Sequence, residues 1–146
     1  MSQVLAQREI VLIPNTDIVK YEISNSELNE LTLKQHYCEL GSPIKPADED
    51  YIPARFTPPE VTRRIQRYTT QNMAEVVGLI ISSRVDVAGN LVGVTQILDC
   101  HPKAAALAKK LLQPKCGVLV QPRIGYAYGM FNRRETKVFG FDVRFK

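Results

Sequence analysis

The 146-residue sequence lacks any long hydrophobic run, and its first ten residues, MSQVLAQREI, lack an apolar core. A membrane-spanning helix needs roughly 20 apolar residues, and a secretory signal peptide needs an apolar stretch behind its start. The sequence therefore predicts neither, and we expect a protein that acts where it is made, without a membrane partner.

Cysteine is also scarce. Cys38, Cys100 and Cys116 are odd in number and show no Cys-x-x-Cys spacing, so neither a disulfide framework nor a zinc site is indicated. We interpret Cys38 and Cys116 as small buried hydrophobes rather than nucleophiles. The acidic run 48–50 has no second ligand cluster beside it, which favours a solvated loop tip over a metal site. No cofactor is expected.

The remaining composition is that of an ordinary globular protein, with 45% hydrophobic and 23% charged residues. A chain of this length fits a single domain, residues 1–146, and buries roughly two thirds of the surface that its unfolded form exposes. The net charge of +4 is compatible with an acidic partner. We interpret the excess as solvated surface rather than as a nucleic-acid groove.

Most of the chain reads as strands. The surest signal is a hairpin in which AEVVGLIISSRVDV and LVGVTQIL flank Ala88, Gly89 and Asn90, because Gly and Asn supply the positive φ angles of tight turns. In the last stretch, Phe139, Phe141, Val143 and Phe145 alternate with polar residues or glycine, as in a half-buried strand. The expected strands are residues 7–15, 20–24, 74–87, 91–98, 117–121 and 137–145.

Helix signals are fewer. Pro102 suits a first helical turn, and Leu107 and Leu111 recur at helical spacing, so the sequence predicts one well-defined helix over 102–113. A second, short helix over 25–36 is a weaker expectation, with Asn25 or Ser26 as its cap. Five prolines between Pro43 and Pro59 predict an irregular loop over 41–60. The order of elements indicates an α+β fold, a small antiparallel β-barrel-like domain.

From residue 37 onward the sequence resembles the core of tailed-phage prohead maturation proteases, which are similar in fold to the herpesvirus assemblins. The resemblance lies in the hairpin VVGLIISSRVDVAGNLVGVTQILD, the helix start HPKAAALAKKLL, the strands CGVLVQPRIG and VFGFDVRF, and the upstream segment CELGSP. That segment resembles the family's Gly-Glu-Leu-x-His-Pro motif. Residues 37–146 carry the whole likeness, and it implies the protease-like barrel.

The departures fall on the residues that would carry the chemistry. In the resemblance, Ser42 stands at the position of the family's catalytic His. The family's nucleophilic Ser lies in a Gly-Val-Ser-Ser-Arg-Gly stretch, whose two serines correspond to Gln121 and Pro122 here. The arginine of that stretch is retained as Arg123. Glutamine and proline supply no nucleophile, and serine is no base near neutral pH. The catalytic site is therefore expected to be degenerate, and Arg123 to bind a carboxylate or phosphate.

The preferred hypothesis is a noncatalytic phage virion or head-assembly protein that acts through contacts with capsid or scaffold proteins. It would be located in the host cytoplasm during assembly and then in the phage head. The candidate binding residues are Arg123, Tyr126, Tyr128, Arg133 and Arg134, and the two tyrosines are either a contact surface or core. Two alternatives stay open: an active prohead protease with a displaced dyad, and a phage regulatory module that binds a host protein or nucleic acid. The sequence also leaves a homo-oligomer open.

Overall fold

A computed structural model describes residues 3–41, 73–128 and 134–146. Within them lie six strands and three α-helices, together with one turn of 3₁₀ helix, η1 (Met73–Glu75). The strands are β1 (Val4–Ile13), β2 (His36–Leu40), β3 (Val76–Val85), β4 (Leu91–Leu98), β5 (Val118–Tyr128) and β6 (Arg134–Phe145). The helices are α1 (Asn15–Lys20), α2 (Asn25–Thr32) and α4 (Ala104–Leu111).

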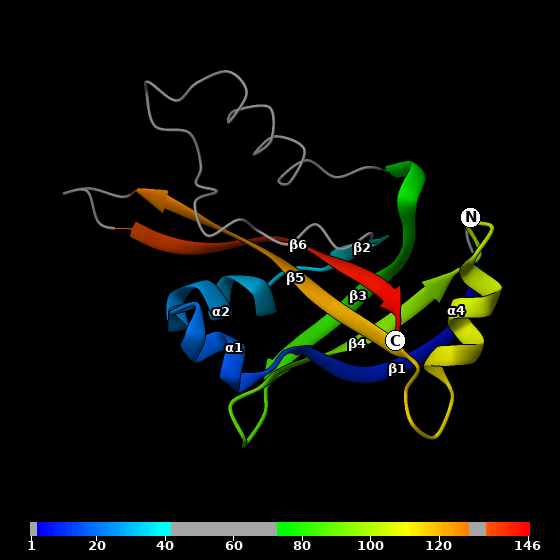
Figure 1. Ribbon diagram of the computed structural model, residues 1–146, viewed down its shortest axis with the longest axis horizontal. Coiled ribbons are helices and arrows are strands. Elements are labelled where there is room, and N and C mark those ends of the chain that lie inside the picture. Colours follow the sequence, from blue (N-terminus) through cyan, green and yellow to red (C-terminus); the bar gives the residue numbers. More distant parts are fainter. Residues whose placement is uncertain (1–2, 42–72, 129–133) are drawn as a thin grey trace.

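The six strands form one curled sheet, a half-barrel, in the order β1-β4-β3-β2-β6-β5 (Figure 1). All neighbours are antiparallel except β2 and β6, which run parallel. The expected α+β class is confirmed, but the sheet is mixed rather than wholly antiparallel. Its two edge strands, β1 and β5, approach each other, but no strand pairing joins them.

The predicted hairpin is confirmed and forms the centre of the sheet as β3 and β4. Its turn closes where the backbone N–H of Asp86 donates to the carbonyl of Asn90 at 2.9 Å. Gly89 adopts a φ of 86°, a conformation that side chains rarely tolerate. The local turn signal therefore sufficed to place these two strands.

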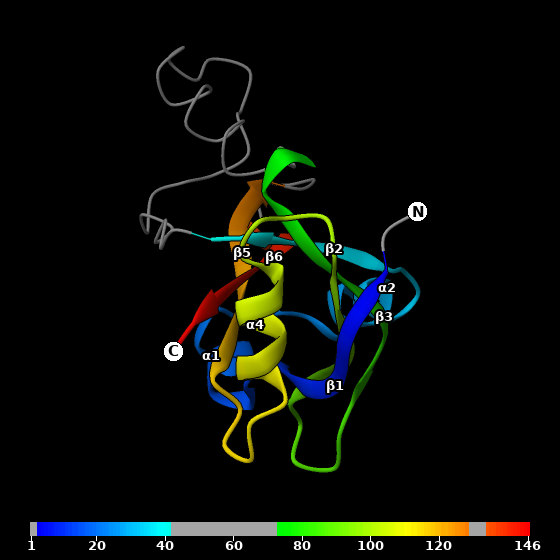
Figure 2. The ribbon, with the colours of Figure 1, turned by 90° about the vertical axis from the view of Figure 1, so that its right-hand side faces the viewer.

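The predicted helix over 102–113 is also confirmed, as α4. Its apolar face, with Ala104, Leu107, Ala108 and Leu111, is buried, whereas Lys109 and Lys110 are exposed in its last turn. Figure 2 shows α4 in front of the half-barrel, with β1 on one side and β5 on the other. It packs against both strands and so covers one end of the curled sheet.

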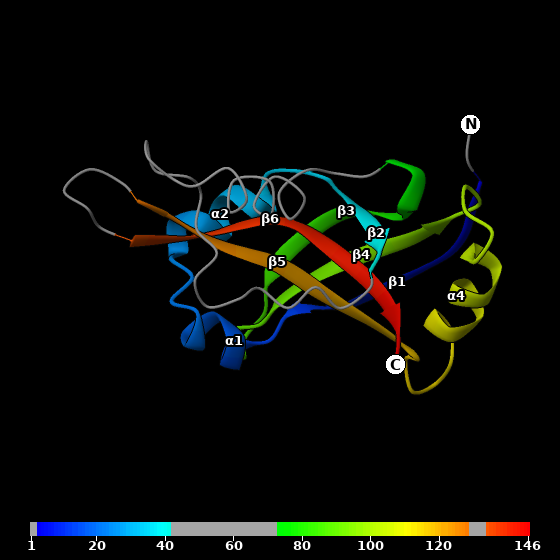
Figure 3. The ribbon, with the colours of Figure 1, turned by 45° about the horizontal axis from the view of Figure 1, so that its top comes forward.

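The prediction of a strand over 20–24 is wrong, because the chain there leaves α1 and turns into α2. The carbonyl of Pro14 accepts the N–H groups of Asp17 and Ile18, which starts α1, and the hydroxyl of Ser24 accepts the N–H of Glu27 at 3.1 Å, which caps α2. The fold thus has more than one helix. Both helices lie at the end of the sheet opposite α4 (Figure 3).

One hydrophobic core joins the sheet to its helices. Leu12, Ile80, Leu107, Phe141 and Val143 are among its fully or almost fully buried members. The predicted alternation of β6 holds at Phe141 and Val143, whereas Phe145 is partly exposed.

Apart from Gly41, the predicted loop 41–60 lies outside the described residues, as do the acidic run 48–50, Ser42 and Arg133. Among the helices that the structure describes, none combines the length and apolar character needed to cross a bilayer.

Candidate functional site

Three adjacent strands bring polar side chains together at one point of the half-barrel. Glu39 of β2 lies beside Asp142 of β6, and Asp142 in turn lies opposite Gln121 of β5. Arg123 stands two residues further along β5 and pairs with Gly140 in the register. Because side chains alternate along a strand, Gln121 and Arg123 belong to the same face of β5.

Arg123 forms ion pairs with both carboxylates. Its Nε lies 3.0 Å from each carboxylate oxygen of Asp142, and its Nη2 lies 2.7 Å from Asp142 Oδ1. The same Nη2 donates to Glu39 Oε2. One guanidinium thus ties β5 to β6 and to β2, with the fork geometry that arginine offers to carboxylates.

The cluster of Arg123, Glu39 and Asp142, here called the charge cluster, is largely withdrawn from water. The exposed fractions of these side chains are 13%, 6% and 14%. Burial alone would lower the pKa of Arg123, but the hydrogen bonds and negative charges of Asp142 and Glu39 outweigh it and raise that pKa. The guanidinium is therefore permanently charged, and the expected carboxylate ligand of Arg123 belongs to the chain itself.

Gly41, at the end of β2, allows the strands to approach one another here. A Cβ at this position would lie 2.6 Å from the Cβ of Asp142, and the Gly41 N–H donates to the Val143 carbonyl at 3.0 Å. A side chain at residue 41 would thus push against the charge cluster.

A small cavity of about 170 Å³ opens beside the charge cluster, lined by Glu39 and Arg123 together with His36, Tyr37 and Phe141. The ring of His36 meets that of Phe141 edge-on, with centroids 5.2 Å apart. Its Nε2 lies 2.8 Å from the Leu31 carbonyl, so this nitrogen carries the proton. The cavity thus combines aromatic rings with one charged wall.

No described nucleophile is activated at this cavity. Cys38 is fully buried, and burial, with the charge of Asp142, raises the pKa of its thiol far above its usual range. Ser83 lies nearby, but its hydroxyl donates to the Leu31 carbonyl at 3.4 Å, the group that also accepts from His36. In the described part of the chain, no hydrogen bond joins Ser83 to His36. The interpretation of Cys38 as a buried hydrophobe is confirmed, whereas Cys116 is only half-buried.

A second histidine, His101, has both ring nitrogens engaged. His101 Nδ1 accepts the N–H of Lys103 at 3.1 Å, just before α4, and its Nε2 lies 3.4 Å from Glu75 Oε2. The neighbouring Cys100 is exposed, and its thiol lies 3.2 Å from the Val76 carbonyl. His101 therefore shapes the start of α4 rather than serving as a base for Cys100.

Of the other sequence-predicted site residues, all but Ser42 and Arg133, which lie outside the described residues, belong to β5 or β6. Pro122 occupies edge strand β5, where one side has no neighbouring strand, so its missing N–H is tolerated. Tyr126 and Tyr128 extend β5, and Arg134 begins β6. Their side chains lie outside the described part of the structure.

Sequence reasoning did not single out Glu39 and Asp142, the partners of Arg123. Both had a signal: Glu39 belongs to the CELGSP segment, and Asp142 is the acidic residue among the alternating apolar positions of β6. An acidic side chain amid buried strand residues generally needs a cationic partner.

Over residues 3–41, 73–128 and 134–146, no group of three or more His, Cys, Asp or Glu side chains is arranged to hold a metal ion. Comparisons with protein-family models, with curated proteins and with solved structures found no match to this chain.

Proposed function

We propose that this chain is a noncatalytic protein of phage head assembly or of the virion, which works through contacts with capsid or scaffold proteins. The proposal rests on its resemblance to prohead proteases and on the residues that stand at the family's catalytic positions. Gln121 and Pro122 lie in strand β5, where neither offers a nucleophile.

The observation that carries the proposal is the ion pair between Arg123 and Glu39. Glu39 belongs to CELGSP and Arg123 to GVLVQPRIG, the two segments whose likeness to the protease motifs is interrupted at the catalytic positions. These segments are 84 residues apart, yet they meet across β6. Together with Asp142, Glu39 and Arg123 of these two segments hold three strands together. This supports a protein that keeps a protease-like fold without catalytic activity.

A fluorophosphonate probe tests whether the protein is noncatalytic. We expect the intact mass of the full chain to stay unchanged after incubation, because no described serine is hydrogen-bonded to an imidazole. A stoichiometric adduct on one serine, lost in a Ser83→Ala or Ser82→Ala variant, would establish the protease with a displaced dyad instead.

Co-purification with capsid and scaffold proteins of the same phage genome tests the contact role. We expect a complex that withstands moderate salt, since protein contacts of a buried apolar kind depend weakly on ionic strength. Binding to duplex DNA that falls steeply as salt rises would favour the regulatory, nucleic-acid-binding alternative.

A further inference from the structure

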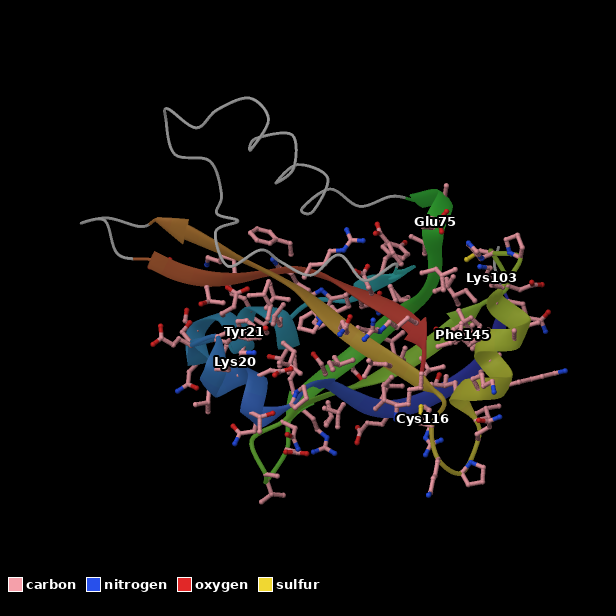
Figure 4. All side chains as sticks on the ribbon, viewed as in Figure 1. Lys20, Tyr21, Glu75, Lys103, Cys116 and Phe145 are labelled. Carbon is pink, nitrogen blue, oxygen red and sulfur yellow. The ribbon has the colours of Figure 1, made fainter. Side chains whose placement is uncertain are left out.

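A cleft of about 400 Å³, here called the α4 cleft, lies at the end of the half-barrel where α4 begins. The ends of β2 and β6, the turn η1 and the residue before α4 form its walls. Its lining residues are Leu40, Gly41, Glu75, Lys103, Arg144 and Phe145. Figure 4 shows three of them, Glu75, Lys103 and Phe145, at the opposite end of the molecule from Lys20 and Tyr21.

Two cations line the α4 cleft without an acidic partner. Lys103 is exposed and Arg144 is half-buried, and neither side chain forms an ion pair among the residues that the structure describes. Glu75, the acidic residue of the lining, lies 3.4 Å from His101 Nε2. Because His101 Nδ1 accepts the backbone N–H of Lys103, its Nε2 carries the proton and points it at this carboxylate. Two cations against one engaged carboxylate leave the lining positive.

The rest of the lining is largely apolar. Phe145, at the end of β6, is 38% exposed, and Leu40, at the end of β2, is half-buried. A phenyl ring that is left partly open next to cations can pack against an apolar group of a ligand. Aromatic and arginine side chains in such pockets often carry much of the affinity of a protein interface. The α4 cleft therefore fits a ligand that combines an anionic group with an apolar one.

The positive charge continues along α4. Lys110 follows Lys103 by seven residues, or two helical turns, so the two lie on one side of the helix, about 10 Å apart along its axis. Ala106, between them, is exposed and small. Lys110 is exposed as well, and within the described residues it too lacks an ion pair. A ligand that leaves the cleft along α4 thus meets a further cation.

The lining favours an acidic protein segment over a nucleic acid. A nucleic-acid backbone carries one phosphate per nucleotide and is bound by cations along its whole path. Glu75 and Leu40 interrupt such a path in the α4 cleft. A single carboxylate needs only the pair of cations at Lys103 and Arg144, and an apolar neighbour suits Phe145.

We propose that the α4 cleft binds a segment of a partner protein in which an acidic residue stands beside an aromatic or large aliphatic one. The carboxylate would lie between Lys103 and Arg144, and the apolar side chain would pack on Phe145. A second acidic residue would meet Lys110. This inference rests on the proposed function, for which it names the surface and the partner's chemistry.

Selection from a displayed library of random nine-residue peptides, with the full chain as bait, tests the proposal. We expect enriched peptides that place Asp or Glu beside Phe, Tyr, Trp or Leu. Their affinity should fall at least about tenfold in Lys103→Glu, which should fold normally because acidic residues are favoured at the start of a helix. Lys34→Glu is the matched control, since it changes the net charge equally but lies just after α2, at the end of the sheet opposite α4 (Figure 3).

A second pair of variants tests the apolar contact. Phe145→Ser should weaken the same peptides several-fold, whereas Leu33→Ser should not, although Leu33 is 84% exposed. Failure to enrich acidic peptides, or enriched peptides that bind Lys103→Glu as tightly as the natural chain, would overturn the proposal. A short duplex DNA that binds the natural chain but not Lys103→Glu, without any enrichment of acidic peptides, would assign the cleft to nucleic acid instead.

The two proposals fail differently. A capsid or scaffold protein that binds Lys103→Glu and Phe145→Ser as tightly as the natural chain would remove the α4 cleft while leaving the contact role in place. A chain that binds neither protein, or that reacts with the fluorophosphonate, would remove the proposed function itself.

Discussion

Replacing Arg123 with methionine removes the cation of the charge cluster while keeping much of the side chain's apolar stem. Asp142 and Glu39 then stay buried on adjacent strands with like charges. Removing one partner of a buried ion pair typically costs about 3–5 kcal/mol of unfolding free energy. A domain of this size has a stability of roughly 5–15 kcal/mol, so the loss should be a large fraction of the total.

Urea unfolding followed by far-ultraviolet circular dichroism measures this effect. With a denaturant slope of roughly 2 kcal/mol per molar urea, the midpoint should fall by about 2 M. Arg84→Met is the matched control, because Arg84 pairs with Glu9 on the exposed surface, where such a pair contributes about 0.2–1 kcal/mol.

A further variant separates charge from packing. The triple variant Arg123→Met, Glu39→Gln, Asp142→Asn removes all three charges and should regain much of the lost stability. Equal midpoint shifts for Arg123→Met and Arg84→Met would refute the reasoning that burial makes this cluster costly to break.

Three other predictions concern the fold. In the native protein, iodoacetamide should alkylate the exposed Cys100 long before the fully buried Cys38, which peptide mass spectrometry can follow; equal rates would contradict the burial. Because burial raises the pKa of the Cys38 thiol above its ordinary 9.0, the folded state keeps that proton more tightly. Stability should be full below this pH and fall by about 1.4 kcal/mol per pH unit above it, a slope that Cys38→Val should lack. Gly89→Ala should cost about 1–2 kcal/mol in thermal unfolding, because φ is 86° there, whereas Gly140→Ala, with no atom near its added Cβ, should cost little.

Sequence reasoning succeeded where the signal was local. The turn around Gly89 and the spacing of Leu107 and Leu111 each act within a few residues, and they placed β3, β4 and α4. It failed over 20–24, where Tyr21 and Ile23 favour a strand by propensity. There the capping by Ser24 and the burial of Ile23 beside two short helices decide the structure.

The charge cluster could be foreseen only in part. The need of Arg123 for an anion follows from its place in a buried strand, but its partners stand 19 and 84 residues away in the sequence. Which acidic side chain meets it depends on the order and register of three strands, and a one-residue shift would turn Asp142 to the other face. The parallel pairing of β2 with β6 carries no local signal.

That parallel pairing has a consequence for how the chain folds. β2 lies early in the sequence, whereas β6, one of its two neighbours in the sheet, is the last strand described. The pairing that joins β5 and β6 to the other four strands therefore connects residues far apart in the chain. The chain loses the entropy of closing this long loop before the pairing contributes any stabilising free energy. Folding is therefore slower than it would be with local pairings alone. During synthesis, β3 and β4 can pair at once, whereas the edge of β2 stays uncovered until β6 has been made. Until then it is the exposed edge at which a growing chain is most prone to pair wrongly with another copy.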